Sequence, residues 1–213
     1  TQDMVMGVFY LTLERDGEKG EGSIFSSPDE AVMAHQTGYV SLHAKVKVRM
    51  EGEFEGEPIR YTIDTTVGKI IFNRSIPQNL GFVDRSDKAH CLDMEIDFTV
   101  DKKKLDRIVD RCYHLRGTTT TALVLDEIKR MGFEYSTKGA VTISVSDLII
   151  PQEKQALLEG ADEEVTEIEN QYKAGLLSPM ERKESVVRVW DKTTKDVTNA
   201  LMNCLTEDNP VNM

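Results

Sequence analysis

The last third of the chain carries the pattern that most restricts its fold. After Pro151, apolar side chains recur at spacings of three and four residues: Leu158, Ala161, Val165, Ile168 and Tyr172. A second series has the same rhythm: Val187, Trp190, Thr194, Val197, Leu201 and Cys204. Such spacing is typical of a heptad seam, in which two helices bury a narrow stripe against each other. The pattern predicts an antiparallel coiled-coil hairpin over residues 151–205.

The stretch between the two series reads A-G-L-L-S-P-M-E-R, residues 174–182. Gly175 can end the first helix, and S-P-M-E predicts a capping box from Ser178 to Glu181 at the start of the second. Each leg would have about 22 to 27 residues and span roughly 35 to 40 Å, at about 1.5 Å per residue. Leu176 and Leu177 then lie at the tip, either as a cap over the seam or as a docking patch for a partner. The local pattern alone favours the cap.

Residues 1 to about 150 mix helical and strand patterns, which predicts an α+β body. S-S-P-D-E-A predicts a helix over about residues 28–36, with Ser27 as its N-cap and Glu30 completing a capping box. Helical spacing predicts one helix from Asp101 and another from about Thr118 to Gly132.

Strand patterns dominate the centre of this body. Alternation over residues 42–50 predicts a strand whose basic face exposes His43, Lys45, Lys47 and Arg49. E-G-E-F-E-G-E-P suits a hairpin loop, and I-R-Y-T-I and T-V-G-K-I-I-F read as returning strands. A-V-T-I-S-V, from residue 140, reads as a closing strand. The predicted fold class is therefore α+β, with a small antiparallel sheet and helices followed by the helical hairpin.

Asp93, Glu95 and Asp97 alternate with apolar residues, so they would lie on one side of an extended segment. A metal site and a solvated strand face are the two readings of this pattern. We favour the solvated face, because no histidine or further carboxylate is spaced to complete a metal shell.

Composition excludes several classes of protein. The sequence has no run of about 18 apolar residues and no basic leader, so it predicts neither a membrane span nor a signal peptide. A cytoplasmic location is therefore expected. Cys91, Cys112 and Cys204 are scattered, which argues for reduced thiols rather than disulfides or a zinc site. A net charge of -11 disfavours a surface that holds nucleic-acid phosphates. No phosphate-binding loop, nucleophile elbow or H-E-x-x-H occurs, so no catalytic residues are predicted in this chain.

Several collinear blocks resemble one family. They are T-Q-D-M-V-M-G-V-F-Y-L-T, G-E-G, L-H-A-K-V-K-V-R, T-T-V-G-K-I-I-F-N, L-D-E-I-K-R-M-G-F, K-G-A-V-T-I-S-V-S-D and G-L-L-S-P-M-E-R. Together they resemble the middle of the largest (beta-prime) subunit of bacterial DNA-directed RNA polymerase, over essentially all 213 residues. The ends, Thr1 without an initiator methionine and N-P-V-N-M, also lead us to expect a piece of a longer protein.

The resemblance implies a role in transcription. In that family the N-A-D-F-D-G-D loop that binds catalytic magnesium precedes the position of Thr1, and the bridge helix and trigger loop follow Met213. The chain would therefore hold no cofactor and be inactive alone, with Mg and Zn bound elsewhere in the full subunit of this nucleotidyltransferase. It resembles the pore and funnel around the secondary channel, through which nucleoside triphosphates enter and the 3′ end of backtracked RNA emerges. Expected partners are the beta, alpha and omega subunits and the remainder of beta-prime.

The resemblance also implies site residues. Gln2, Lys102 and Lys103 would line the channel. The coiled coil resembles the rim on which transcript-cleavage factors dock, and this now favours docking over capping for the tip. The expected docking residues are Lys173, Leu176, Leu177, Ser178, Glu181 and Arg182. Some relatives bind a guanosine tetraphosphate alarmone through a lysine and a tyrosine, but Thr119 and Arg130 stand at the matching positions, so we predict no such site.

The predicted domains are a pore and funnel body over residues 1–150, the rim hairpin over 151–205 and a truncated tail over 206–213. The alternative function is a free-standing coiled-coil adaptor unrelated to polymerisation. The natural reading frame would distinguish these two functions, because a polymerase segment must be preceded by the metal loop and followed by the bridge helix.

Overall fold

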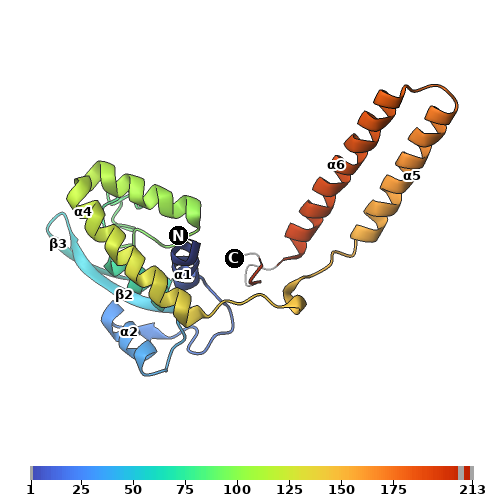
Figure 1. Ribbon diagram of the computed structural model, residues 1–213. Helices are drawn as coiled ribbons and strands as arrows, with labels where there is room; N and C mark the ends of the chain where they lie inside the picture. The colour runs from blue at the N-terminus through green and yellow to red at the C-terminus, as the bar shows by residue number, and fades with distance from the viewer. Residues whose placement is uncertain (1, 206–208, 212–213) are drawn as a thin grey trace. The chain divides into compact units, whose positions relative to one another are not determined.

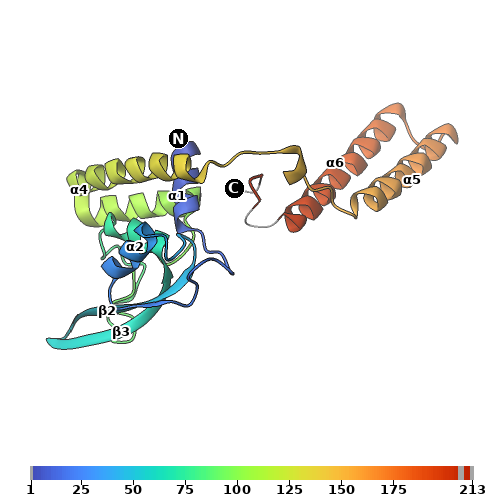
Figure 2. The same cartoon turned by 90° about the horizontal axis from the view of Figure 1, so that it is seen from below.

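The computed structural model describes residues 2–205 and 209–211. The chain forms two compact units, Thr1–Ala140 and Val141–Met213 (Figures 1 and 2). The first combines helices with a three-stranded sheet, and the second is built on a long helical hairpin, so the predicted fold class is confirmed. Of the predicted tail, residues 206–208 and 212–213 lie outside the described residues.

The sheet of the first unit has the order β1-β2-β3. β1 (Ile24–Phe25) is parallel to β2 (Lys45–Phe54), which is antiparallel to β3 (Glu57–Thr66). The predicted hairpin loop over residues 51–58 is wrong in extent, because pairing continues to Phe54 and Glu57. Only Glu55 and Gly56 turn, both at positive φ (50° and 84°), which matches the right-handed twist of a two-residue hairpin.

Helix α2 (Pro28–Gln36) has the bounds that the sequence predicts. Ser27 Oγ accepts a hydrogen bond from Glu30 N (3.2 Å), as an N-cap should. The Glu30 carboxylate, however, accepts from Ser26 N (2.6 Å) rather than from Ser27, so the predicted reciprocal box is displaced by one residue.

His43 is buried, although the alternation predicts it on the exposed face of a strand. β2 begins two residues later, at Lys45, and His43 Nδ1 donates to the backbone oxygen of Leu13 (3.2 Å). Its ring meets Tyr10 edge-on, with the centroids 4.6 Å apart. A segment that has not yet entered the strand does not obey the period of two, and neighbouring elements decide which side chains it buries.

T-V-G-K-I-I-F forms helix α3 (Val67–Arg74), so the predicted returning strand is wrong. Thr66 Oγ1 accepts from Lys69 N (3.3 Å) and caps the helix. Six of its eight residues are buried. An apolar segment that is buried on nearly every side shows no clear period, and the sequence then cannot distinguish a helix from a strand.

Helices α1 (Gln2–Thr12) and α4 (Lys102–Gly139) cross at two glycines in the first unit. A Cβ on Gly7 would lie 1.8 Å from Gly132 O, and a Cβ on Gly132 would lie 2.8 Å from Met4 O. α4 itself turns back at Gly117, which has φ 75° and ψ 178°, so its two halves correspond to the two predicted helices (Figures 1 and 2). The predicted end of the second helix at Gly132 is wrong, because the helix continues to Gly139. The main core fills the space between these elements, with Val8, Leu11, Phe72, Ile108 and Ile128 among its members.

Residues 92–98 are irregular and form no strand, and Glu95 is buried, so the predicted solvated strand face is wrong at this residue. The Glu95 carboxylate accepts from Phe82 N (2.8 Å) and lies 3.4 Å from Arg85 Nη2. A buried carboxylate needs such partners, and they come from a loop that the sequence pattern does not place nearby.

The start of this segment is held against β3 by Tyr61. The Tyr61 hydroxyl donates to Asp93 Oδ1 (3.1 Å) and accepts from Leu92 N (2.6 Å). Asp93 Oδ2 also accepts from His90 Nδ1 (2.8 Å). Burial raises the pKa of Tyr61 to about 12, so its hydroxyl stays protonated at neutral pH.

We expect the His90–Asp93 contact to make stability depend on pH. The hydrogen bond to Asp93, followed by the attraction of its charge, raises the pKa of His90 above 6.5. A group with a raised folded-state pKa stabilises the fold below its unfolded pKa and loses that contribution as the pH rises through the folded pKa. His90→Gln should therefore lower the free energy of unfolding more at about pH 5.5 than at about pH 8.5. Urea denaturation at both pH values measures this; equal losses at both would contradict it.

The second unit contains α5 (Lys154–Lys173) and α6 (Pro179–Cys204), packed as an antiparallel pair. The α5 seam is the predicted one. In the first half of α6 the seam is shifted by one residue, to Val186, Val189 and Thr193, while Val187, Trp190 and Thr194 are exposed. Ala161 and Thr193 are the buried residues of the two helices, and such small side chains allow the helices to approach closely.

The predicted closing strand at A-V-T-I-S-V is also wrong. The segment is irregular and leads into a short 3₁₀ helix, η1 (Val145–Asp147). Ile143 and Val145 are exposed, so no sheet edge within the described residues receives the segment.

Candidate functional site

The tip of the α5–α6 hairpin is a backbone turn that both helix ends stabilise. Gly175, at φ 77°, lets α5 end in a Schellman motif. Leu176 N donates to Gln171 O (3.0 Å) and Gly175 N donates to Tyr172 O (2.9 Å). These bonds satisfy carbonyl groups at the end of α5 and fix the direction in which the chain leaves the helix.

The first turn of α6 is closed by the predicted capping box. Ser178 Oγ accepts from Glu181 N (3.3 Å), and Glu181 Oε2 accepts from Ser178 N (2.8 Å). Hydrogen bonding with Ser178 lowers the pKa of the Glu181 carboxyl, and the bond from the Ser178 backbone contributes more than the bond with the Ser178 side chain. Both side chains therefore have a structural task at the tip, whatever else they contact.

The two tip leucines differ in exposure. Leu176 is 74% exposed, whereas Leu177 is half-buried. Met180, which the sequence analysis did not single out, is 78% exposed. Leu177 is therefore placed to cap the end of the seam, whereas Leu176 and Met180 lie on the surface of the tip. Position 180 could have been found from the sequence, because it lies outside both heptad series in the first turn of α6.

Arg182 connects the two helices just below the tip. Its Nη1 donates to Glu169 Oε1 (3.1 Å), and its guanidinium lies 4.9 Å from the ring centroid of Tyr172. Lys173 is exposed at the end of α5. Arg182 is thus held in place at a partly exposed position, which leaves a fixed cation beside the apolar tip.

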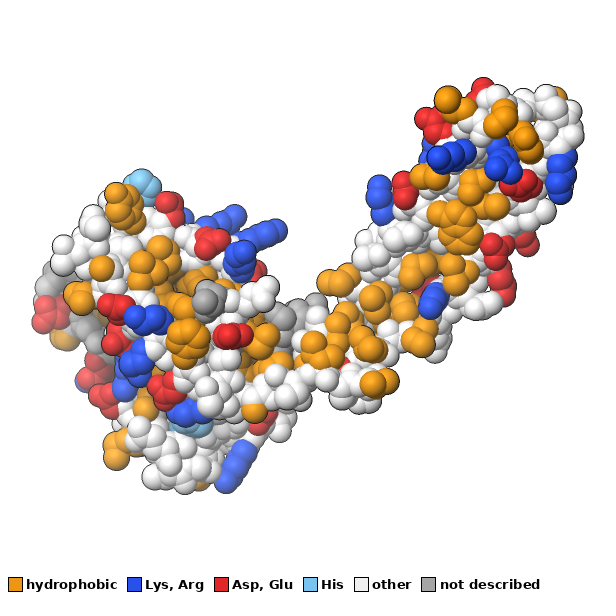
Figure 3. Space-filling model, in the orientation of Figure 1, with side chains coloured by type: hydrophobic (Ala, Val, Ile, Leu, Met, Phe, Trp, Pro, Cys, Tyr) orange, Lys and Arg blue, Asp and Glu red, His pale blue; other side chains and the backbone are white. Residues whose placement is uncertain are grey.

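An exposed apolar stripe continues along α6 through Val187 and Trp190. On the face shown in Figure 3, hydrophobic side chains follow the hairpin and reach its upper end, where charged side chains surround them. The heptad spacing predicts both residues in the seam. Their exposure follows from the one-residue shift, because V-V-R-V-W offers two apolar pairs with the same spacing.

The predicted channel residues lie in the first unit. Gln2 is the first residue of α1, and Lys102 and Lys103 begin α4 after its N-cap Asp101. All three side chains are exposed. They belong to the first compact unit, whereas the hairpin residues belong to the second.

Among the described residues, no group of three or more histidine, cysteine, aspartate or glutamate side chains is arranged to hold a metal ion. Across the same residues, no helix combines the length and apolar character needed to cross a membrane.

Comparison with known proteins identifies the family. The family RNA polymerase Rpb1, domain 3, matches residues 1–148, which is more than half of the chain. The chain belongs to this family. It is also 55% identical over all 213 residues to the DNA-directed RNA polymerase subunit beta' of Thermoanaerobacter pseudethanolicus. The corresponding subunits of Clostridium novyi and Caldicellulosiruptor saccharolyticus are 54% and 53% identical over the same length.

The resemblance inferred from the collinear blocks is thereby confirmed as homology to the beta' subunit. The chain covers 18% of the length of each of these three relatives. Domain 3 matches the α+β unit and the start of the following linker, whereas the alignments to the beta' subunits also include the α5–α6 hairpin.

Proposed function

We propose that this chain serves as part of a beta' subunit in DNA-templated RNA synthesis, where it forms the wall of the secondary channel and a rim that docks transcription factors. The identity of 55% to a beta' subunit over all 213 residues carries this proposal. The exposed Leu176 and Met180 beside the fixed Arg182 support the docking role, since apolar anchors ringed by polar groups are typical of small interfaces.

In this role the α+β unit, proposed as residues 1–150, is the pore and funnel body, and residues 151–205 form the rim hairpin. Gln2, Lys102 and Lys103 face the route of nucleoside triphosphates and of the 3′ end of backtracked RNA. The beta, alpha and omega subunits and the remainder of beta' are the assembly partners. Magnesium and zinc are bound by other parts of the subunit, and the location is cytoplasmic.

A segment exchange tests the proposal. The 213 matching residues of the Thermoanaerobacter pseudethanolicus subunit are replaced by this chain, and the hybrid is assembled with the other subunits of that enzyme. We expect template-dependent RNA synthesis by the hybrid and none by the 213-residue chain alone, because the chain holds no predicted catalytic residue. A hybrid that assembles but synthesises no RNA, or synthesis by the isolated chain, would refute the proposal.

A further inference from the structure

A partly buried segment without regular structure leads directly into α4. We call residues 95–100 the strap. The strap has no strand partner, and side chains satisfy several of its backbone polar groups, among them those of Ile96. The side chains that do so come from α1, α3, the loop after α3 and the first turn of α4.

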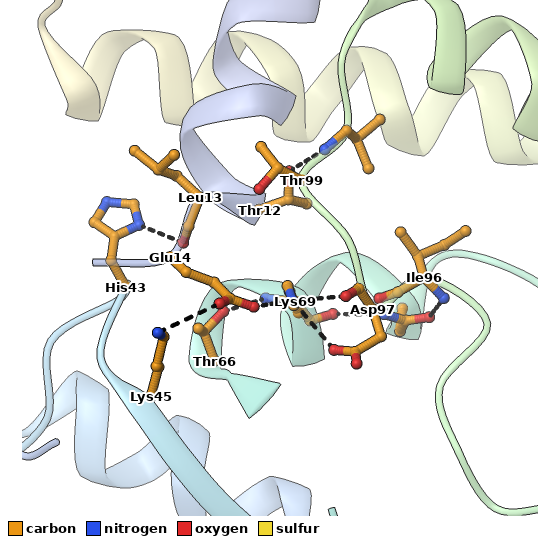
Figure 4. A network of polar contacts seen from close by, with 12 residues as sticks. Thr12, Leu13, Glu14, His43, Lys45, Thr66, Lys69, Ile96, Asp97 and Thr99 are labelled. Carbon is orange, nitrogen blue, oxygen red and sulfur yellow. Dashed lines mark hydrogen bonds and ion pairs between the residues drawn. The ribbon is translucent and has the colours of Figure 1, made fainter. Parts of the chain in front are cut away.

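Lys69 of α3 makes the most unusual of these contacts. Its side chain is only 2% exposed, and an ammonium group is rarely buried to this extent without compensation. Nζ donates to the backbone oxygen of Asp97 (2.8 Å) and to Asp97 Oδ1 (3.1 Å), and it also contacts the Glu14 carboxylate. Figure 4 shows Lys69 between Glu14 on one side and Asp97 on the other. The cation therefore joins α3 both to the strap and to the residues that follow α1.

Two more side chains hold the strap on either side of this ion pair. Asn73, one turn after Lys69, donates through Nδ2 to Ile96 O (2.7 Å) and accepts through Oδ1 from Ile96 N (3.0 Å). Thr12 Oγ1 accepts from Val100 N (2.9 Å). The strap is thus fixed at residues 96, 97 and 100 by groups from two helices.

The end of the strap sets the start of α4. Asp101 follows Val100 and caps the helix by accepting from Lys104 N (2.8 Å). Lys104 Nζ returns to Thr99 O (2.7 Å). Lys102 and Lys103 lie between these anchors and have exposed side chains. The positive charges of three successive lysines are unfavourable at the positive end of the helix dipole. This turn therefore depends more than an ordinary first turn on the hydrogen bonds made by Asp101 and Lys104.

We propose that Lys69 is a positioning residue: its buried ammonium fixes the strap and, through it, holds the Lys102–Lys103 turn in place. The role of these two lysines in the channel rests on the proposed function, whereas the fixing of the strap does not. Lys69→Met should still fold, because the methionine fills the space of the aliphatic stem and both carboxylates have partly exposed side chains that can regain water.

Hydrogen exchange on the 213-residue chain tests the first step. In Lys69→Met we expect the Ile96 and Val100 amides to exchange about tenfold faster or more, with the Met131 amide in the core of α4 unchanged. Lys69→Arg, which keeps a buried cation, should retain most of the protection. Lys129→Met is the matched control, because Lys129 is an exposed lysine of α4 paired with Asp126. Unchanged protection of Ile96 and Val100 in Lys69→Met would overturn the proposal.

Kinetics of the hybrid polymerase test the second step. We expect Lys69→Met to raise the KM for nucleoside triphosphates several-fold, about as much as Lys102→Ala plus Lys103→Ala does, with little change in kcat. The triple variant should be no worse than the double variant, because Lys69 acts through the same two lysines. Additive effects would overturn this positioning role. If the double variant leaves KM unchanged, the channel role of the lysines fails, and hydrogen exchange alone decides whether Lys69 fixes the strap.

Discussion

Gly7→Ala is expected to destabilise the α+β unit by about 3 kcal/mol or more, at or beyond the upper end of the usual cost of overpacking a core. The added Cβ would lie 1.8 Å from Gly132 O and 2.8 Å from Ser136 N, and both are backbone atoms of α4. A Cβ has no rotamer through which to escape, so α1 and α4 must separate. Separation removes contacts from Val8 and Leu11, which are fully buried in the main core.

Gly160→Ala is the matched control, because Gly160 lies in a helix, α5, with nothing within 4 Å of an added Cβ. This change should stabilise the hairpin by about 0.5 to 1 kcal/mol, through the higher helix propensity of alanine. Urea denaturation followed by far-UV circular dichroism reports on both units, while fluorescence of Trp190, the single tryptophan, reports on the hairpin. A loss below about 1 kcal/mol in Gly7→Ala would mean that the α1–α4 crossing is looser than described.

Changing both tip leucines to alanine should weaken the binding of a transcript-cleavage factor by roughly a hundredfold or more, while the hairpin keeps its fold. Apolar anchors at the centre of a small interface can each contribute about 2 kcal/mol or more to binding. The expected stability loss is on the order of 1 kcal/mol, because burial at about 25 cal/mol per Å² covers only some tens of Å² at a hairpin end. It should come mainly from Leu177, the half-buried leucine.

The single variants separate docking from capping. Leu176→Ala should lower affinity with almost no change in thermal unfolding, whereas Leu177→Ala should change both. Leu123→Ala is the control, since Leu123 is a 66% exposed leucine on α4 in the other unit. Calorimetric titration of the factor into hybrid polymerases measures affinity, and Trp190 fluorescence of the isolated chain measures unfolding of the hairpin. A clear stability loss with unchanged affinity in the double variant would leave both leucines as structure alone.

Local sequence patterns predicted the elements that a few neighbouring residues specify. S-P-M-E contains both members of the capping box that starts α6, and Ser27 caps α2 through its side chain. The α5 seam follows from a spacing that only one helix face can satisfy. The seam of α6 was ambiguous, because Val186 and Val189 repeat at the same interval as Val187 and Trp190, and only contact with Ala161 and its neighbours in α5 selects between them.

In the candidate site, too, some features could be predicted from local sequence and others depended on the fold. The position of the tip and its capping residues followed from sequence, but the contrast between Leu176 and Leu177 did not, because exposure depends on how the Schellman turn directs each side chain. Arg182 was predicted as a docking residue without its ion pair to Glu169, which lies 13 positions earlier in the chain and comes close only when the hairpin closes.

The sequence by itself determined the family, the fold class and the helical hairpin, since these rest on many collinear matches and on periodicities that repeat over several turns. The tertiary structure alone decided α3, the strap and the burial of His43 and Lys69. These features depend on partners 23 to 88 positions away, such as Glu14 for Lys69, Ile96 for Asn73 and Thr12 for Val100. Burying a polar group is unfavourable unless such partners are present, and local sequence patterns carry no information about partners that only the fold brings together.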